Sequence, residues 1–173
     1  MVCPQARHVC GSSPTRSSFL PHNPQMELET WGLMDPARFI EQIAGRHRLV
    51  AGLALLAVVE DPASKQAIKH VETLPIDSRI EHYPQATDVL YEAMQRLPLL
   101  DLADRDVRHS VVTVIVRPGL AVAGRNEAAW TLAWKHSNHL RHAFTGNLLL
   151  VTEHGWYDLM SEQGAAVPSM RST

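Results

Sequence analysis

The chain has 173 residues, of which 45% are hydrophobic and 20% are charged, values typical of one ordinary globular domain. Its formal net charge is −2, from 18 acidic and 16 basic residues. No block of like charge stands out, so composition argues against a surface built for nucleic acid or an anionic membrane.

Cysteine usage and the apolar runs bear on the compartment. Cys3 and Cys10 are the only cysteines, and their spacing matches no common zinc motif. The longest apolar run, residues 49–59, is shorter than the roughly 20 residues that a membrane-spanning helix needs. Because the N-terminus also lacks the pattern of a signal peptide, we expect a cytoplasmic protein without a membrane segment.

The composition of the sequence changes near Met26. Residues 1–25 are rich in Pro, Ser, Arg and His without any hydrophobic period, which is typical of a tail that does not fold. Either this tail is genuine, or Met26 or Met34 is the natural start. We predict a single domain over residues 26–163 and a frayed end over residues 164–173.

The first half of that domain contains a helix and a hairpin. Asp35-Pro36 is a typical helix start, and Gly45 can end the helix. The run 49–59 fits either a buried helix or a buried strand by periodicity alone. Because turn residues follow it and a second apolar run comes next, we interpret residues 49–74 as a β-hairpin.

The second half alternates helices and strands. Apolar spacing predicts a helix over residues 86–97, and the β-branched run 111–116 predicts a central strand. A second helix is expected over residues 126–144, capped by Gly146, before a buried strand over residues 148–152. Residues 154–157 turn out of that strand. The expected fold is a mixed α/β domain in which helices pack on a central mixed sheet, with the last two strands parallel.

The loop after the central strand is the first candidate site, because ligands of open α/β sheets gather at the carboxyl ends of strands. It begins at Arg117 and runs into a helix at Arg125, Asn126 and Glu127. Two arginines beside free helix N–H groups could hold a small anion. The alternative is a solvated loop in which Asn126 caps the helix and Glu127 complements its dipole.

Histidines on the late part of the same helix form the second candidate. His136 and His139 share a face and could supply two metal ligands, as could His139 and His142. No carboxylate completes a known metal motif. The alternative is a polar helix face whose cationic residues favour the helix C-terminus, and we therefore predict no metal and no cofactor.

Other chemistry has little support. Trp130 and Trp134 have the spacing of core residues, and the few basic residues around them do not fit a platform for stacking bases. The serines between residues 64 and 169 lie in no nucleophile motif. We predict no catalytic residue of the nucleophilic kind.

The element order and the segment 148–159 resemble the JAB/MPN metalloprotease-like fold, most nearly its RadC-type branch. In that family the buried strand ends in an H-x-H-P-S-G turn, and an S-x-x-D helix start follows. Here Ile115 and Arg117 stand where the two histidines are expected, and Pro118-Gly119 matches the turn. Glu127 falls where the family has its ligand Asp.

The resemblance therefore implies a relative without the metal, since a catalytic zinc needs three protein ligands. We expect a non-catalytic domain that binds a protein partner or a small anion. The residues expected at the ligand are Arg117, Arg125, Asn126, Glu127, His136 and His139. The alternative is a hydrolase whose non-standard site combines Arg117, Glu127, His136 and His139. A homo-oligomer is compatible with either function, and nucleic acid is not an expected partner.

Overall fold

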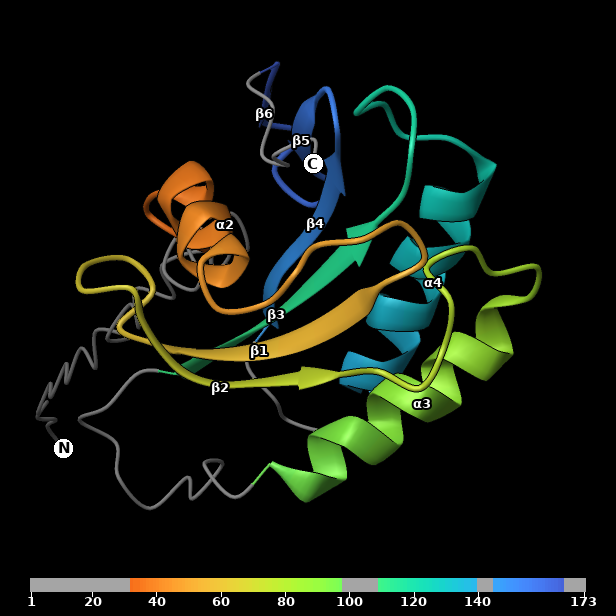
Figure 1. Cartoon of the computed structure of the whole chain (residues 1–173). Helices are drawn as coiled ribbons and strands as arrows, with labels where there is room; N and C mark the ends of the chain where they lie inside the picture. The colour runs from red at the N-terminus through yellow and green to blue at the C-terminus, as the bar shows by residue number, and fades with distance from the viewer. Residues whose placement is uncertain (1–31, 98–108, 140–144, 167–173) are drawn as a thin grey trace, which may run out of the picture.

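The computed structural model describes residues 32–97, 109–139 and 145–166. It confirms the mixed α/β class: one six-stranded sheet carries helix α2 on one face and helices α3 and α4 on the other (Figure 1). The elements in chain order are α2 (Pro36–Ala44), β1 (Ala54–Glu60), β2 (Ala67–Thr73), α3 (Tyr83–Arg96), β3 (His109–Val116), α4 (Arg125–His139), β4 (Thr145–Thr152), β5 (Gly155–Asp158) and β6 (Gly164–Ala165).

The sheet has the strand order β2-β1-β3-β4-β5-β6. β1 pairs antiparallel with β2, which confirms the predicted hairpin. β3 lies between β1 and β4, antiparallel to the first and parallel to the second. The predicted strand–helix–strand unit therefore has its two strands parallel and adjacent. Their carboxyl ends lie side by side, at residues 117 and 153, where the α/β topology favours a ligand.

Alternation along the central strands creates two cores, because successive side chains of a strand point to opposite faces. In β3, Val111 and Ile115 face α3 and α4, whereas Val112, Val114 and Val116 face α2. Both faces are covered, which explains why residues 111–116 are β-branched and, apart from Thr113, apolar, with no regular alternation of apolar and polar residues.

The helices follow from local signals in the sequence. Asp35 caps α2 by accepting a hydrogen bond from the Arg38 N–H at 2.9 Å, and Pro36 occupies its first turn. The core positions predicted for Trp130 and Trp134 are confirmed, since both side chains are buried. Helix α3 begins at Tyr83, three residues before the predicted start.

Three predictions about the C-terminal part are corrected. Gly146 does not cap a helix but lies inside β4, where a Cβ would collide with the Val111 carbonyl oxygen. The predicted turn at residues 154–157 is shorter, because β5 begins at Gly155. Residues Gly164–Ala165, expected to be frayed, pair with β5 as strand β6.

The predicted tail 1–25 and residues 140–144 of the predicted second helix lie outside the described residues. Among the helices that the structure does describe, none is both long and apolar enough to cross a membrane.

Candidate functional site

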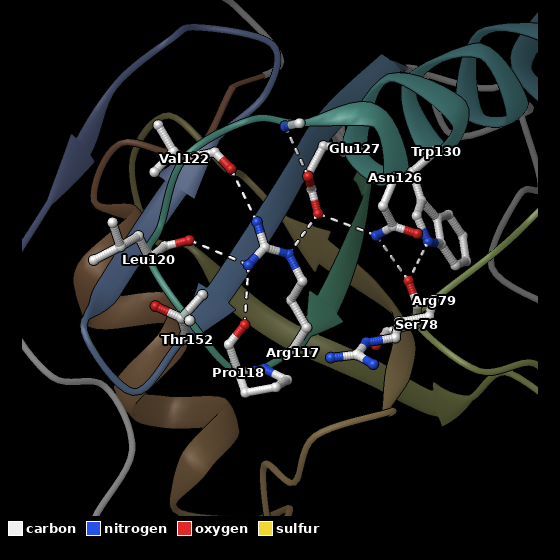
Figure 2. A network of polar contacts seen from close by, with 12 residues as sticks. Ser78, Arg79, Arg117, Pro118, Leu120, Val122, Asn126, Glu127, Trp130 and Thr152 are labelled. Carbon is white, nitrogen blue, oxygen red and sulfur yellow. Dashed lines mark hydrogen bonds and ion pairs between the residues drawn. The ribbon is translucent and has the colours of Figure 1, made fainter.

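The first residue after β3, Arg117, forms an ion pair with Glu127 in the first turn of α4. The Arg117 Nε donates to Glu127 Oε1 at 2.7 Å (Figure 2). The Arg117 side chain is 17% exposed and that of Glu127 only 2%. This pair is therefore mostly shielded from water, unlike an ordinary surface salt bridge.

The remaining part of the guanidinium faces the backbone of the loop that follows. Arg117 Nη1 donates to the carbonyl oxygens of Pro118 at 3.0 Å and Leu120 at 3.2 Å, and Nη2 donates to that of Val122 at 2.9 Å. Together with the bond to Glu127, these contacts use four of the five N–H groups of the Arg117 guanidinium. The side chain thus folds the loop around itself and has little donor capacity left for a ligand.

Glu127 accepts three hydrogen bonds. Besides Arg117, its donors are the Asn126 Nδ2 at 3.0 Å and the Gly124 N–H at 2.8 Å. The last contact is half of a capping box, in which the third helical residue reaches back to the residue before the helix. Burial raises the pKa of Glu127, but the hydrogen bonds from Arg117, Asn126 and Gly124, with the charge of Arg117, outweigh it and lower the pKa below 4.5.

Asn126 connects the ion pair to the segment before α3. Its Oδ1 accepts from the Ile80 N–H at 2.9 Å, and its Nδ2 donates to the Ser78 carbonyl oxygen at 3.1 Å. The same carbonyl accepts from the indole Nε1 of Trp130 at 2.7 Å. We call Ser78, Arg117, Asn126, Glu127 and Trp130 the Arg117 network. It joins β3, the loop, α4 and residues 78–80 into one unit.

Glu153 contributes from the neighbouring parallel strand. It follows β4, and its Oε1 accepts from the Gly119 N–H at 2.8 Å. This hydrogen bond lowers the pKa of the Glu153 carboxyl, and the nearby His154 and Arg117 lower it further. This hydrogen bond connects the segments that follow β3 and β4. Because the two strands are parallel neighbours, their carboxyl ends lie at the same edge of the sheet, where a shared site can form.

A second buried carboxylate, Asp158, lies at the end of β5. Its Oδ2 accepts from Asn147 Nδ2 and from Ser161 Oγ, both at 2.6 Å, and its Oδ1 accepts from the Met160 N–H at 3.0 Å. Asn147 in turn accepts from the Leu33 N–H at 2.8 Å. We call Asn147, Asp158 and Ser161 the Asp158 cluster, and it contains no cation.

The structure brings together only part of the predicted site. Arg117, Asn126 and Glu127 are in contact, although Asn126 lies inside α4 and does not cap it. Arg125 begins the helix and is exposed. His136 is exposed as well, with its ring 5.4 Å from that of Tyr83. The side chain of His139 lies outside the described residues.

The geometry does not favour the hydrolase alternative. His136 is nine residues beyond Glu127 on α4, about 13.5 Å along the helix axis, which is well beyond hydrogen-bond reach. Across the described ranges, no group of three His, Cys, Asp or Glu side chains could hold a metal ion. The polar atoms of the Arg117 network are bonded to one another, so the arrangement serves to fix a loop.

Sequence reasoning missed Ser78, Glu153 and the polar role of Trp130. A buried indole needs an acceptor for its N–H, so the core position of Trp130 could have signalled a nearby carbonyl. Nothing in the sequence indicated that Ser78 would bond to α4 or that Glu153 would bond to the loop. Comparison with protein-family models, with curated proteins and with solved structures finds no match.

Proposed function

We propose that this chain is a non-catalytic α/β domain related to the JAB/MPN fold, of the RadC type, in which an ion pair replaces the metal centre. In this proposal the domain acts in the cytoplasm and binds a protein partner through the loop between β3 and α4. The observation that supports it most is the direct contact of Arg117 with Glu127 at 2.7 Å.

Two positions that the resemblance assigns to a metal ligand carry a cation and an anion here. Arg117 stands at a histidine position and Glu127 at that of the ligand Asp, and the guanidinium supplies the positive charge beside the carboxylate. At the other histidine position, Ile115 is buried among hydrocarbon side chains and offers no lone pair to a metal. The donor set therefore does not fit a zinc ion.

A protein partner is favoured over a small anion by the hydrogen bonds of Arg117. Its donors point to Glu127 and to loop carbonyls, so an anion would have to displace bonds already made. The loop itself presents apolar side chains to solvent, and apolar surface is a feature of protein interfaces.

Elemental analysis of protein purified without a His-tag tests the metal-free proposal. We expect far less than one zinc per chain, in the wild type and in the Glu127→Ala and His139→Ala variants alike. A stoichiometric zinc that either substitution removes would contradict the proposal and support the hydrolase alternative. Thermal unfolding with and without a chelator provides a second readout, and we expect the same midpoint in both.

A further inference from the structure

The loop over residues 119–124, which we call the apolar loop, has an unusual composition for a surface segment. Its sequence, Gly-Leu-Ala-Val-Ala-Gly, contains no polar side chain. Leu120 is 66% exposed and Val122 is 56% exposed. A single exposed apolar residue is ordinary on a protein surface, whereas a contiguous exposed apolar segment is a candidate interaction site.

The backbone of the apolar loop is fixed from inside. The carbonyls of Leu120 and Val122 accept hydrogen bonds from Arg117, while the N–H groups of Gly119 and Gly124 donate to Glu153 and Glu127. Figure 2 shows the guanidinium enclosed by these carbonyls. A surface held in one conformation loses less entropy when a partner binds, so this arrangement favours recognition.

Two arginines lie beside the same end of α4. Arg125 is the first residue of the helix, and Arg79 lies between Ser78 and Ile80, which both bond to Asn126. Both side chains are exposed, and neither has an ion pair or hydrogen bond with any residue that the structure describes. A cation at a helix N-terminus opposes the helix dipole, so Arg125 does not stabilise α4.

Carboxylates near these arginines form no ion pair with them among the residues that the structure describes. Glu127 and Glu153 bond to Arg117 and Gly119. Asp77 accepts from the Arg79 N–H, and its carboxylate lies beside Gly52. Glu81 precedes α3. The two unpaired guanidinium groups are thus available to a carboxylate from outside the chain.

We propose that Leu120, Val122, Arg79 and Arg125 form a docking surface for a peptide segment of a partner protein in which apolar side chains alternate with Asp or Glu. Apolar side chains of the segment would cover Leu120 and Val122, and its carboxylates would pair with the arginines. This inference rests on the proposed binding function and names the chemistry of its partner.

A random-peptide library displayed on phage, selected against the immobilised full chain, tests the inference. We expect enrichment of peptides that combine Leu, Ile, Phe or Trp with neighbouring Asp or Glu. The enriched peptide is then synthesised, and its dissociation constant is measured by fluorescence anisotropy. Leu120→Ser combined with Val122→Ser should weaken binding at least tenfold, and Arg125→Gln severalfold with a smaller dependence on salt.

Leu132→Ser is the matched control, because Leu132 is an apolar side chain on α4 that is 46% exposed but lies outside the apolar loop. It should change the dissociation constant less than twofold. The inference is overturned if no such peptide is enriched, or if the enriched peptides bind the loop variant as well as the wild type. Self-association of the chain, or vesicle binding, that the loop variant abolishes would also overturn it, in favour of a second copy or a membrane surface.

The two proposals fail separately. A zinc-free protein that selects no acidic, apolar peptide would retain the metal-free assignment and lose the docking surface. A stoichiometric zinc would remove the metal-free assignment, whatever peptides are selected.

Discussion

Two buried carboxylates, Glu127 and Asp158, are stabilised in different ways. Glu127 has a cation beside it, and the same guanidinium also bonds to three loop carbonyls. Asp158 is fully buried but has only neutral donors: an amide, a hydroxyl and a backbone N–H. The Glu127 carboxylate organises a loop that reaches solvent, and the Asp158 carboxylate connects the end of β5 to Asn147 of β4 and to residues 160–161.

The two carboxylates show that a buried polar group can organise either a surface loop or the interior. A buried charge that is hydrogen-bonded on all sides can be tolerated without a counter-ion. An arginine adds reach, since its planar fork can hold several backbone carbonyls at once. The Arg117 network therefore fixes the conformation of an exposed segment. The Asp158 cluster connects β5 to β4 through Asn147, and Asn147 in turn bonds to the backbone of Leu33.

The largest expected effect comes from removing the cation. Arg117→Met leaves the Glu127 carboxylate buried without its partner and frees three carbonyls. We expect the free energy of unfolding to fall by about 3–5 kcal/mol, the typical cost of breaking a buried pair from one side. Urea unfolding followed by tryptophan fluorescence measures this change.

Two controls accompany that variant. Arg125→Met removes an exposed arginine eight residues away in the sequence, and it should change stability by less than about 0.5 kcal/mol. Adding Glu127→Gln to Arg117→Met removes the uncompensated charge and should restore part of the loss. A loss below about 1 kcal/mol in Arg117→Met would show that water reaches the pair freely.

A smaller loss is expected at the other carboxylate. Asp158→Asn keeps the shape but places an amide opposite the amide of Asn147, so at least one donor loses its acceptor. We expect a loss of about 1–3 kcal/mol in the free energy of unfolding. Ser161→Ala, which removes one donor at the surface side of the cluster, should cost less. If Asp158→Asn costs as much as Arg117→Met, the cation adds nothing beyond hydrogen bonding.

The stabilisation that Glu127 gives to the folded state should decrease as the pH falls. Because the folded-state pKa of Glu127 lies below 4.5, its contribution is fully present above the unfolded-state pKa and is lost as the pH falls through the folded-state value. The stability difference between the wild type and Glu127→Gln should therefore be largest near pH 7 and shrink as the pH falls below 4.5. Urea unfolding of both proteins over pH 3–7 measures it, and a constant difference would contradict the lowered pKa.

Much of the fold could be predicted because local signals and burial agree. The Asp35-Pro36 start of α2 and the continuous β-branched run of β3 each have one good structural interpretation. Errors concentrate at Gly146 and Gly164, where glycine permits close approach of two strands and does not mark a turn or an end. A single sequence contains no information about which distant strand will come close.

The site was less predictable for the same reason. Arg117 and Glu127 were expected near each other, since one ends a strand and the other begins the next helix. That the arginine would turn inward, toward Leu120 and Val122 carbonyls, depends on loop conformation. Ser78 bonds to the end of β3 and to α4, and Glu153 bonds to the loop, from 39 and 36 positions away from Arg117 in the sequence. No local pattern encodes these contacts.

The smallest effect on the free energy of unfolding is expected at the apolar loop. Substitutions there should affect partner binding without affecting stability. Leu120 and Val122 point to solvent, and their contribution to the fold comes from backbone carbonyls that any residue supplies. Leu120→Ser and Val122→Ser should therefore change the free energy of unfolding by less than about 0.5 kcal/mol each. A loss above about 2 kcal/mol, comparable to truncation of a core residue, would mean that these side chains pack within the chain and leave no exposed surface for a partner.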